Sequence, residues 1–318
     1  MARVLVTRRL PAGALDAVVA AGHEIVARDD DIPYSHDELV TLAPAFDAIV
    51  CLLTDRIDDD VLSSGALGNL RVVANVAVGY DNIDVAAASR NHIAVCNTPG
   101  VLDETTADLA FLLVLAASRL ASTAEADLRA DRWEGWGINQ YLGHDVHGAV
   151  LGLVGHGRIG RAVARRASGF GMQVLHHTRT DTGVAGWTAS LDDLLRRSDI
   201  VSLHVPLTDT TRHLIGAREL ALMKPTAVLV NTARGPVVDE AILAQALEDG
   251  VIFAAGIDVY EREPDVHPRL LAAPRTVLLP HIGSATHATR TRMAQVAAQG
   301  VLAVLAGETP ETLVAPTC

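Results

Sequence analysis

The amino-acid sequence predicts an α/β protein with two parallel-sheet domains. Short apolar runs alternate with helical patterns from the start of the chain to its end, which is typical of parallel strands joined by crossover helices. The 318 residues are more than one such domain usually needs. Nearly half of the residues are apolar but only 3% are aromatic, so we expect aliphatic side chains to fill the cores.

The first third of the chain is predicted to form one small α/β unit. We expect short strands at Val4–Thr7, Ala48–Leu53, Val72–Asn75 and Ala94–Asn97. Helices are expected at Ala12–Ala21 and after Ile83, between these strands. Pro99-Gly100 then interrupts the pattern and separates this unit from the rest.

A second α/β series follows a largely helical stretch. A long apolar helix is predicted from about Thr105 to Arg119, and another helix carries Arg129, Arg132 and Trp133. Six strands are then expected, at Val150–Val154, Gln173–His176, Ile200–His204, Ala227–Asn231, Phe253–Val259 and Val277–Leu279. A final helix, Ala288–Ala306, is long enough to return to the first unit.

Charge and cysteine content narrow the classes of function. The formal net charge of −12 argues against nucleic acid or an anionic membrane surface as a partner, although a local arginine can still bind an anionic substrate. Cys51, Cys96 and Cys318 are too widely spaced for a zinc site or a disulfide framework, so we expect no metal. The N-terminus resembles a strand and not a signal peptide, and the most apolar helix is too short for a bilayer, so we expect a soluble cytoplasmic protein.

A glycine fingerprint follows the predicted strand Val150–Val154. Gly155, Gly157 and Gly160 form Gly-x-Gly-x-x-Gly, and the helical run Arg161–Ala167 comes next. The first glycine permits a tight turn, the second lets the backbone approach a pyrophosphate, and the third allows close helix–strand packing. The helix N-terminus adds N–H groups and a positive dipole end. In this strand–helix setting, the motif predicts a bound dinucleotide.

The end of the next strand bears on which dinucleotide binds. An acidic residue there would bind the ribose 2′-OH of NAD, but Thr178 and Arg179 occupy the place. A carboxylate would repel a 2′-phosphate, whereas threonine and arginine can donate hydrogen bonds to one. We therefore predict a preference for NADP(H), with NAD(H) possible. The alternative is that Arg179 is solvated and Asp181 binds the ribose.

Three residues with suitable chemistry stand just after predicted strands of the same sheet, where open α/β folds gather ligands. They are Arg234, Glu263 and His281. Histidine suits proton transfer near neutral pH, a carboxylate beside it would favour the imidazolium, and arginine offers a planar fork for carboxylate and carbonyl oxygens. Spacing alone leaves Glu261 as a competitor for the acidic role, and Arg234 could equally be a structural ion-pair partner.

An ordered set of motifs carries a family resemblance. It runs through Val78-Gly-Tyr-Asp-Asn-Ile-Asp84, Asn97-Thr-Pro-Gly-Val-Leu102, Thr105-Thr-Ala-Asp-Leu-Ala110, Gly155–Gly160, Phe170-Gly-Met172, Asn231-Thr-Ala-Arg-Gly235, Asp239-Glu240, Glu261-Arg-Glu-Pro264 and Leu279-Pro-His-Ile-Gly-Ser284. The chain resembles the D-isomer-specific 2-hydroxyacid dehydrogenases, most closely the glyoxylate/hydroxypyruvate reductases. That resemblance implies hydride transfer from NADPH or NADH to a small 2-oxo acid.

The resemblance also implies roles for individual residues. His281 would be the acid/base residue, Glu263 its partner because it directly precedes a proline, and Arg234 a substrate ligand. Substrate contacts would also come from Leu53, Val78 and Gly79, the last two through backbone N–H groups. Besides Gly155, Gly157, Gly160, Thr178 and Arg179, which are predicted above, the dinucleotide would be lined by Thr106, Arg158, Ile159, Val205, Pro206, Thr232, Ala233, Asp258 and Ser284. Asp258 could equally be a helix cap.

By the same resemblance, the fold is two Rossmann-like doubly wound parallel-sheet domains, with the dinucleotide domain inserted in the substrate domain. The substrate domain would comprise residues 1–99 and 286–318, and the dinucleotide domain residues 100–285. The family implies a homodimer in which Trp136 reaches the partner's substrate pocket. An interface anchor without a role in specificity is the alternative for Trp136.

Two departures from the family pattern and two other functions stay open. His156 stands inside the fingerprint where the family has an apolar residue, which raises the question of a pH effect on cofactor binding. Pro236 replaces a frequent glycine and is expected to stiffen a turn. A dinucleotide sensor resembling the corepressors of this fold is one alternative function. A dehydrogenase of 3-phosphoglycerate or phosphite is the other.

Overall fold

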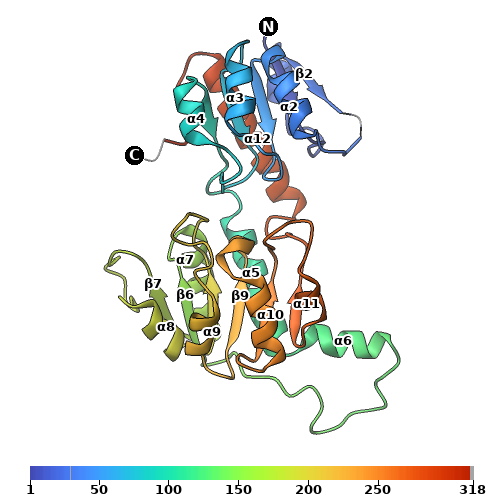
Figure 1. Cartoon of the computed structure of the whole chain (residues 1–318), viewed down its shortest axis with the longest axis vertical. Coiled ribbons are helices and arrows are strands. Elements are labelled where there is room, and N and C mark those ends of the chain that lie inside the picture. The colour runs from blue at the N-terminus through green and yellow to red at the C-terminus, as the bar shows by residue number, and fades with distance from the viewer. Residues whose placement is uncertain (29, 316–318) are drawn as a thin grey trace. The chain divides into compact units, whose positions relative to one another are not determined.

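The computed structural model describes residues 1–28 and 30–315, and the chain divides into two compact α/β units (Figure 1). Unit 1 comprises Met1–Leu102 and Ser284–Cys318, and unit 2 comprises Asp103–Gly283. Unit 2 is therefore one continuous segment inserted between the two parts of unit 1. The sequence-based prediction divides the chain at residues 99 and 285.

Unit 1 is built on a five-stranded sheet in the order β2-β1-β3-β4-β5, and the strand pairs are parallel. Its strands are β1 (Arg3–Val6), β2 (Glu24–Ala27), β3 (Ala48–Cys51), β4 (Val72–Asn75) and β5 (Ala94–Cys96). The central strands β3 and β4 are buried along their whole length, which explains their continuous apolar sequence. Strand β2 is absent from the sequence-based prediction; it lies at an edge and is largely unburied.

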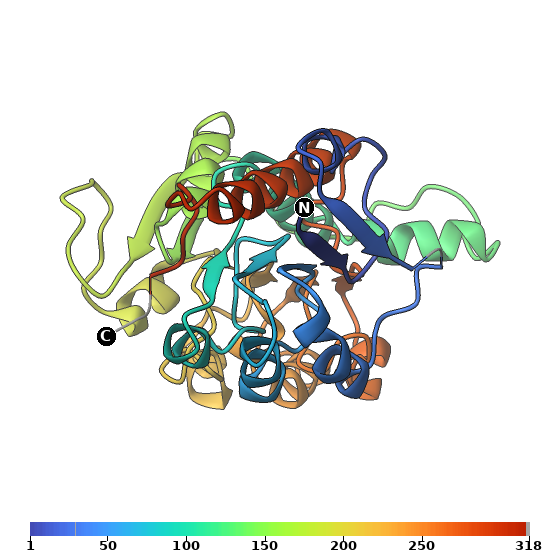
Figure 2. The same ribbon diagram turned by 90° about the horizontal axis from the view of Figure 1, so that it is seen from above.

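Helices cover both faces of this sheet. They are α1 (Asp16–Ala20), α2 (His36–Leu42), α3 (Asp59–Ala66), α4 (Val85–Arg90) and α12 (His287–Leu305), with a short 3-10 turn at Ala43–Ala45. Figure 2 shows α1 and α12 on one face and α2 to α4 on the other. A Cβ on Gly300 of α12 would lie 3.1 Å from the Cys96 side chain, so this helix packs closely on β5. Cys51 and Cys96 are buried and free, and Cys318 lies outside the described residues.

Unit 2 has a six-stranded parallel sheet in the order β11-β10-β9-β8-β6-β7. Its strands are β6 (Val150–Val154), β7 (Gln173–His177), β8 (Ile200–Leu203), β9 (Val228–Asn231), β10 (Ala254–Ile257) and β11 (Thr276–Leu278). The two sheets and their helices confirm the predicted α/β class. All six strands predicted for this region are present, with ends that differ by a few residues.

The helices of unit 2 also lie on both faces of its sheet. They are α5 (Asp103–Ser118), α7 (Arg158–Ser168), α8 (Leu191–Arg197), α9 (Ala217–Leu222), α10 (Glu240–Glu248) and α11 (Pro268–Ala272), with a 3-10 turn at Gly235–Val237. Helices α5 and α7 pack together on one face, and α8, α9 and α10 form the other layer. A Cβ on Gly256 of β10 would lie 2.8 Å from Leu113, so α5 packs directly on β10.

Helix α6 (Ala121–Arg129) and the loop after it differ from the rest of unit 2. None of its residues is buried, and the chain then runs to β6 without regular helix or strand. The helix ends at Arg129, so the prediction that it also carries Arg132 and Trp133 is wrong; Asp131 adopts a left-handed φ of 55° that breaks the helix.

In the described part of the chain, no single helix has the length and apolarity needed to cross a membrane. The pair α5 and α6 reaches that length and composition only together, and the chain bends by 68° between them.

Candidate active site

The glycine fingerprint forms the turn between β6 and α7. Gly155 has a φ of +97°, and a Cβ there would lie 2.5 Å from the His204 carbonyl oxygen, so only glycine fits. Gly160 packs equally closely, because its Cβ would meet the Gly155 carbonyl oxygen at 2.4 Å. Gly157 differs from both: it caps the N-terminus of α7 and would have open space around a Cβ. The turn is therefore tight on the side of the sheet and open at Gly157.

The N-terminus of α7 has no side-chain cap. Gly157 offers no side chain to accept the first N–H groups of the helix, so these donors and the positive end of the dipole are left for a ligand. The helix continues for 11 residues, long enough to carry a substantial dipole. Arg158 and Ile159 begin the helix, the first exposed and the second half-buried. This geometry fits the pyrophosphate of a dinucleotide.

His156, which departs from the family pattern, is buried in this turn. Its ring stacks on that of His176 from β7, with ring centroids 3.9 Å apart. Burial lowers the pKa of His156, and the positive charges of His176 and Arg161 lower it further. Burial also lowers the pKa of His176, against the opposing effect of Asp181. The surroundings of both rings therefore disfavour the imidazolium form.

The segment after β7 fixes Thr178. Its hydroxyl donates to the Thr180 carbonyl oxygen at 2.7 Å and accepts from the Trp187 indole N–H at 3.2 Å. Arg179 is exposed beside it. Asp181, the alternative ribose ligand, accepts a hydrogen bond from the Gly183 N–H at 2.8 Å, which engages one carboxylate oxygen within the loop.

His281 and Glu263 form the central pair of the site. The Nδ1 atom of His281 lies 2.7 Å from Oε2 of Glu263, while Oε1 of Glu263 accepts from the Tyr260 N–H at 3.0 Å. Burial tends to raise the pKa of Glu263, but the hydrogen bond and charge of His281, the Tyr260 N–H and the charge of Arg234 outweigh it and hold that pKa below its usual range. A carboxylate on Nδ1 leaves Nε2 of His281 to exchange a proton with a substrate.

Glu261, the competing acid, has a different role. Its Oε1 accepts from the Glu240 N–H at 3.0 Å and lies 2.9 Å from Nε2 of His213. It therefore fastens the start of α10 and pairs with a different histidine. The structure thus separates the two glutamates that spacing alone could not.

Arg234 stands just beyond β9, in the turn before the 3-10 segment. Its Nη1 donates to the Ala233 carbonyl oxygen at 2.9 Å, and its own carbonyl oxygen accepts from the Asn231 side chain at 2.9 Å. The Asn231 side chain also accepts from the Ala233 N–H at 3.0 Å, so this buried amide shapes the whole turn. Arg234 follows β9 and Glu263 follows the neighbouring parallel strand β10, so both stand at the carboxyl edge of the sheet.

Asp258 anchors the loop that carries His281. It is only 1% exposed, and its two carboxylate oxygens accept from the Ile282 and Gly283 N–H groups at 2.8 and 2.9 Å. Its backbone carbonyl oxygen accepts from the His281 N–H at 2.9 Å. These bonds hold His281 in a left-handed conformation, φ 53°, which is costly for a residue with a side chain. Burial raises the pKa of Asp258 to about 6 despite the N–H donors and the charge of His281.

Other predicted dinucleotide contacts of unit 2 lie at or near the same edge. Thr106, in the first turn of α5, has its side chain within 3.5 Å of where a Cβ on Gly283 would stand. Val205 and Pro206 follow β8, and Thr232 and Ala233 follow β9. The hydroxyl of Thr232 is buried and has no hydrogen-bond partner among the described residues. Such a group is uncommon and fits a polar atom of a bound dinucleotide.

The remaining predicted contacts lie elsewhere. Leu53, Val78, Gly79 and Ser284 belong to unit 1, where Leu53 follows β3 and the Val78–Gly79 loop follows β4. Trp136 lies in the loop after α6 and is 80% exposed, so it is not part of the edge that carries His281. Pro236 lies within the 3-10 turn that follows Arg234.

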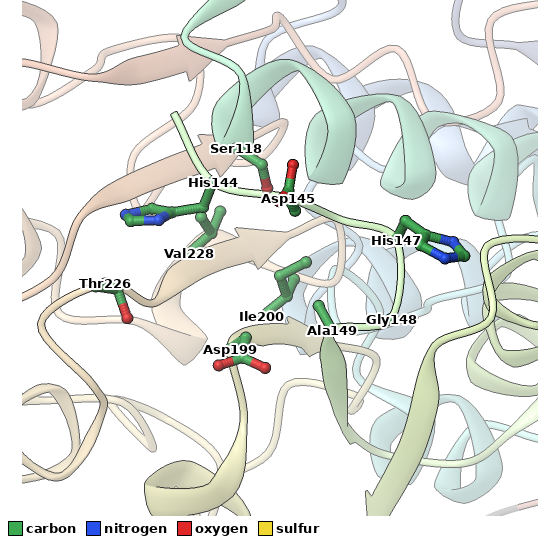
Figure 3. Close-up of a pocket in the computed structure, with 10 residues that line it drawn as sticks. All are labelled: Ser118, His144, Asp145, His147, Gly148, Ala149, Asp199, Ile200, Thr226 and Val228. Carbon is green, nitrogen blue, oxygen red and sulfur yellow. The ribbon is translucent and has the colours of Figure 1, made fainter. Parts of the chain in front are cut away.

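A separate pocket of about 260 Å³ opens at the opposite edge of the unit 2 sheet (Figure 3). It is lined by Ser118, His144, Asp145, His147, Gly148, Ala149, Asp199, Ile200, Thr226 and Val228. Ala149, Ile200 and Val228 of this lining stand at the amino ends of β6, β8 and β9. Arg234, Glu263 and His281 instead follow the carboxyl ends of β9, β10 and β11. None of the predicted site residues lines this pocket, so we do not assign the chemistry to it.

Comparisons with known proteins identify the family of the chain. Residues 111–283 match the model of the NAD binding domain of the D-isomer specific 2-hydroxyacid dehydrogenases. A glyoxylate reductase of Korarchaeum cryptofilum is 47% identical, with 98% of this chain and 95% of the relative covered. A glyoxylate reductase of Thermococcus litoralis is 42% identical, with 98% and 96% covered.

Solved structures also resemble this chain over nearly its whole length. A protein from Thermus thermophilus superposes with a TM-score of 0.92 at 43% identity, with 98% of this chain and all of that chain covered. An NADPH-dependent glyoxylate/hydroxypyruvate reductase from Sinorhizobium meliloti, in complex with NADP and malonate, has a TM-score of 0.86 at 34% identity, with 99% and 97% covered.

Proposed function

The chain belongs to the D-isomer specific 2-hydroxyacid dehydrogenase family, and from this premise we propose that it reduces glyoxylate or hydroxypyruvate, with NADPH preferred over NADH. It is an oxidoreductase that uses a nicotinamide dinucleotide to reduce a 2-oxo acid. The single observation that carries the proposal is the His281–Glu263 pair, 2.7 Å apart, on the sheet edge that also carries Arg234 and the fingerprint.

The residues of unit 2 divide the chemistry between them. A bound dinucleotide supplies the hydride. His281 donates a proton from Nε2 to the carbonyl oxygen of the substrate, because Nδ1 is engaged by Glu263. Glu263, held as a carboxylate, stabilises the imidazolium and fixes the ring. Arg234 offers its guanidinium to the substrate carboxylate and carbonyl oxygen.

The preference for NADPH is supported by the segment after β7. The one O–H of Thr178 is engaged by the Thr180 carbonyl oxygen, so Thr178 fixes this segment and the exposed Arg179 guanidinium beside it supplies the donors for a 2′-phosphate. One carboxylate oxygen of Asp181 is engaged by Gly183, which weakens the case for Asp181 as a ribose ligand. The related Sinorhizobium reductase was solved with NADP.

A kinetic panel tests both parts of the proposal. Glyoxylate, hydroxypyruvate, pyruvate and 3-phosphohydroxypyruvate are each assayed with NADPH and with NADH by the absorbance at 340 nm. We expect the highest kcat/KM with glyoxylate or hydroxypyruvate and NADPH. Dinucleotide binding without turnover of any substrate would instead indicate a sensor.

Arg179→Ala sharpens the cofactor test. Removal of one charged donor to a phosphate should lower kcat/KM for NADPH about 10- to 100-fold and leave that for NADH nearly unchanged. Arg212→Ala, at another exposed arginine of unit 2, is the control. An equal loss with both dinucleotides, or a wild-type preference for NADH, would contradict the NADPH assignment.

We further propose that the protein is a homodimer formed through α6 and the loop after it. Five large apolar side chains are exposed there, namely Leu128, Trp133, Trp136, Ile138 and Leu142. Helix α6 buries none of its own residues, which is unusual for a helix of a monomer. Sedimentation analysis of the wild type and of Trp136→Ala tests this, and a monomeric wild type at micromolar concentration would reject it.

A further inference from the structure

The loop that follows β4 in unit 1 is held through its carbonyl oxygens. Three consecutive carbonyls accept hydrogen bonds: Ala77 O from the Thr98 N–H at 2.9 Å, Val78 O from Nδ2 of Asn97 at 2.8 Å, and Gly79 O from Nδ2 of Asn75 at 2.8 Å. Asn75 ends β4, and Asn97 follows the neighbouring strand β5. The donors therefore come from two adjacent strand ends of one sheet.

These bonds determine where the N–H groups of the loop point. The peptide bonds here are trans, and in a trans peptide the N–H is directed opposite to the preceding C=O. Fixing Ala77 O therefore directs the Val78 N–H, and fixing Val78 O directs the Gly79 N–H. Both N–H groups face away from the strand ends that hold the carbonyls. Asn97 thus controls the Gly79 N–H through the opposite side of the same peptide.

Asn75 links this loop to the loop after β3. Besides its bond to Gly79, its Nδ2 donates to Oδ1 of Asn82 at 3.0 Å. Nδ2 of Asn82 in turn donates to the carbonyl oxygens of Leu52 at 3.1 Å and Asp55 at 3.0 Å. Asn75 and Asp55 are almost fully buried. Leu53 and the Val78–Gly79 loop therefore belong to one hydrogen-bonded block.

The amide side chain suits this task electrostatically. It donates hydrogen bonds without carrying a net charge. Asn75 and Asn97 therefore place no fixed charge beside the binding position that the two N–H groups face. A buried lysine could hold the same carbonyls only at a large desolvation cost. A pair of aligned backbone N–H groups is a suitable donor set for an oxyanion such as a carboxylate.

We propose that Asn97 is a positioning residue for the substrate carboxylate, acting by aiming the Gly79 N–H, and that Asn75 holds the next peptide of the loop in register. Neither side chain touches the substrate. The inference rests on the proposed function and on the substrate contacts that the family resemblance implies for the N–H groups of Val78 and Gly79, which we assign to the carboxylate of the 2-oxo acid.

The test compares a substrate that has a carboxylate with one that lacks it. Asn97→Ala removes the donor to Val78 O, and Asn97→Asp keeps the shape of the side chain but presents an acceptor. We expect each variant to lower kcat/KM for glyoxylate about 10- to 100-fold, mainly through KM. For methylglyoxal, in which an acetyl group replaces the carboxylate, we expect less than about a twofold change.

Two further measurements exclude a general structural effect. The Kd of NADPH should be unchanged in both variants, whereas oxamate, an unreactive carboxylate analogue, should bind to the NADPH complex about 10- to 100-fold more weakly. Asn91→Ala is the matched control, because Nδ2 of Asn91 also donates to a backbone carbonyl of unit 1, Ala87 O at 3.0 Å, but at the end of α4. It should behave as wild type.

Equal losses for glyoxylate and methylglyoxal, or an unchanged KM for glyoxylate in both Asn97 variants, would overturn this inference while the proposed function stands. A wild-type protein that reduces no 2-oxo acid would overturn the proposed function itself, and this inference with it. The two failures are distinguished by the wild-type assay alone.

Discussion

The two units share a topology but differ in what stands at their strand ends. Unit 1 has the order β2-β1-β3-β4-β5, and unit 2 has the matching order β7-β6-β8-β9-β10 with β11 added at the edge. After the first strand of unit 2, Gly155 and Gly157 have no side chains, so a ligand can approach the backbone there. At the equivalent place in unit 1, the Thr7 hydroxyl donates to the buried Asp55 carboxylate at 2.5 Å, so hydrogen-bonded side chains occupy this strand end.

The remaining strand ends differ in charge. In unit 2 they carry Arg234, Glu263 and His281, which can move protons and bind anions. In unit 1 the ends of β4 and β5 carry Asn75 and Asn97, which hold backbone carbonyls. In our proposals, the same sheet edge therefore serves chemistry in unit 2 and recognition by neutral groups in unit 1. The fold provides the edge, and the residues placed on it decide the function.

Replacing His281 should have the largest effect and tests whether unit 2 carries the chemistry. His281→Ala removes the proton donor and should lower kcat about 10²- to 10⁴-fold, with little change in the Kd of NADPH. Steady-state kinetics and a fluorescence titration measure the two quantities.

His213→Ala is the matched control, because it removes the other histidine–glutamate pair of this unit, His213–Glu261, and should leave kcat unchanged. Near-normal turnover in His281→Ala would show that His281 is not the proton donor. It would contradict the proposal that the strand ends of unit 2 carry the chemistry.

Arg234→Lys should raise the KM for glyoxylate strongly, by about 100-fold, because an ammonium cannot reproduce the planar fork of a guanidinium. Steady-state kinetics with saturating NADPH measure it, with Arg212→Lys as the control at an exposed arginine of the same unit. A small change in KM alongside a large loss of folding stability would reassign Arg234 to a structural ion pair.

The fingerprint glycines should separate binding from folding. Gly157→Ala places a methyl group in open space, so it should leave the thermal midpoint nearly unchanged but weaken NADPH binding by about 10-fold or more. Gly160→Ala places the methyl group 2.4 Å from the Gly155 carbonyl oxygen and should destabilise the protein by about 1–3 kcal/mol. Thermal melts and NADPH titrations measure both variants. If Gly157→Ala binds NADPH normally, the pyrophosphate does not approach that turn.

The buried histidine stack should give the smallest effect, seen in the pH dependence of stability. The pKa of His156 is lower in the folded protein than in the unfolded chain, so its contribution to stability is present above the unfolded pKa and is lost as pH falls through the folded pKa. His156→Phe keeps the ring but cannot titrate. Urea melts should therefore show that the free energy of unfolding falls less between pH 7.5 and pH 5 in His156→Phe than in the wild type.

His287→Phe, at an exposed position, should keep the wild-type pH dependence. An identical loss of stability in wild type and His156→Phe would show that protonation of the stack does not limit stability in acid.

Most of the fold could be predicted from the sequence because buried parallel strands have continuous apolar runs. All six strands of unit 2 and the four buried or central strands of unit 1 are predicted in this way. Strand β2 is missed because Glu24-Ile-Val-Ala is short and lies at an edge with little burial. The sequence-based prediction extends helix α6 too far, because a helical pattern does not reveal the left-handed conformation of Asp131.

Only part of the candidate site can be predicted from the sequence. Spacing placed Arg234, Glu263 and His281 after strands, yet Glu261 fitted equally well, and only the observed contacts separate the two acids. The sequence assigns no role to Asn75 or Asn97, since neutral amides are common and have no distinctive chemistry, although Asn97 begins one of the motifs that carry the family resemblance. Both stand at the carboxyl ends of buried strands, and this position gains meaning only when the carbonyls that they hold are known.

The insertion of unit 2 also sets an order for biosynthesis. One face of the unit 1 sheet packs against α12, whose residues 287–305 are translated after the whole of unit 2. Unit 2 is continuous and has all of its own strands by residue 283, so it can fold on the ribosome while the first 102 residues still expose an apolar sheet face. A nascent chain stalled before α12 would therefore be the species most in need of a chaperone.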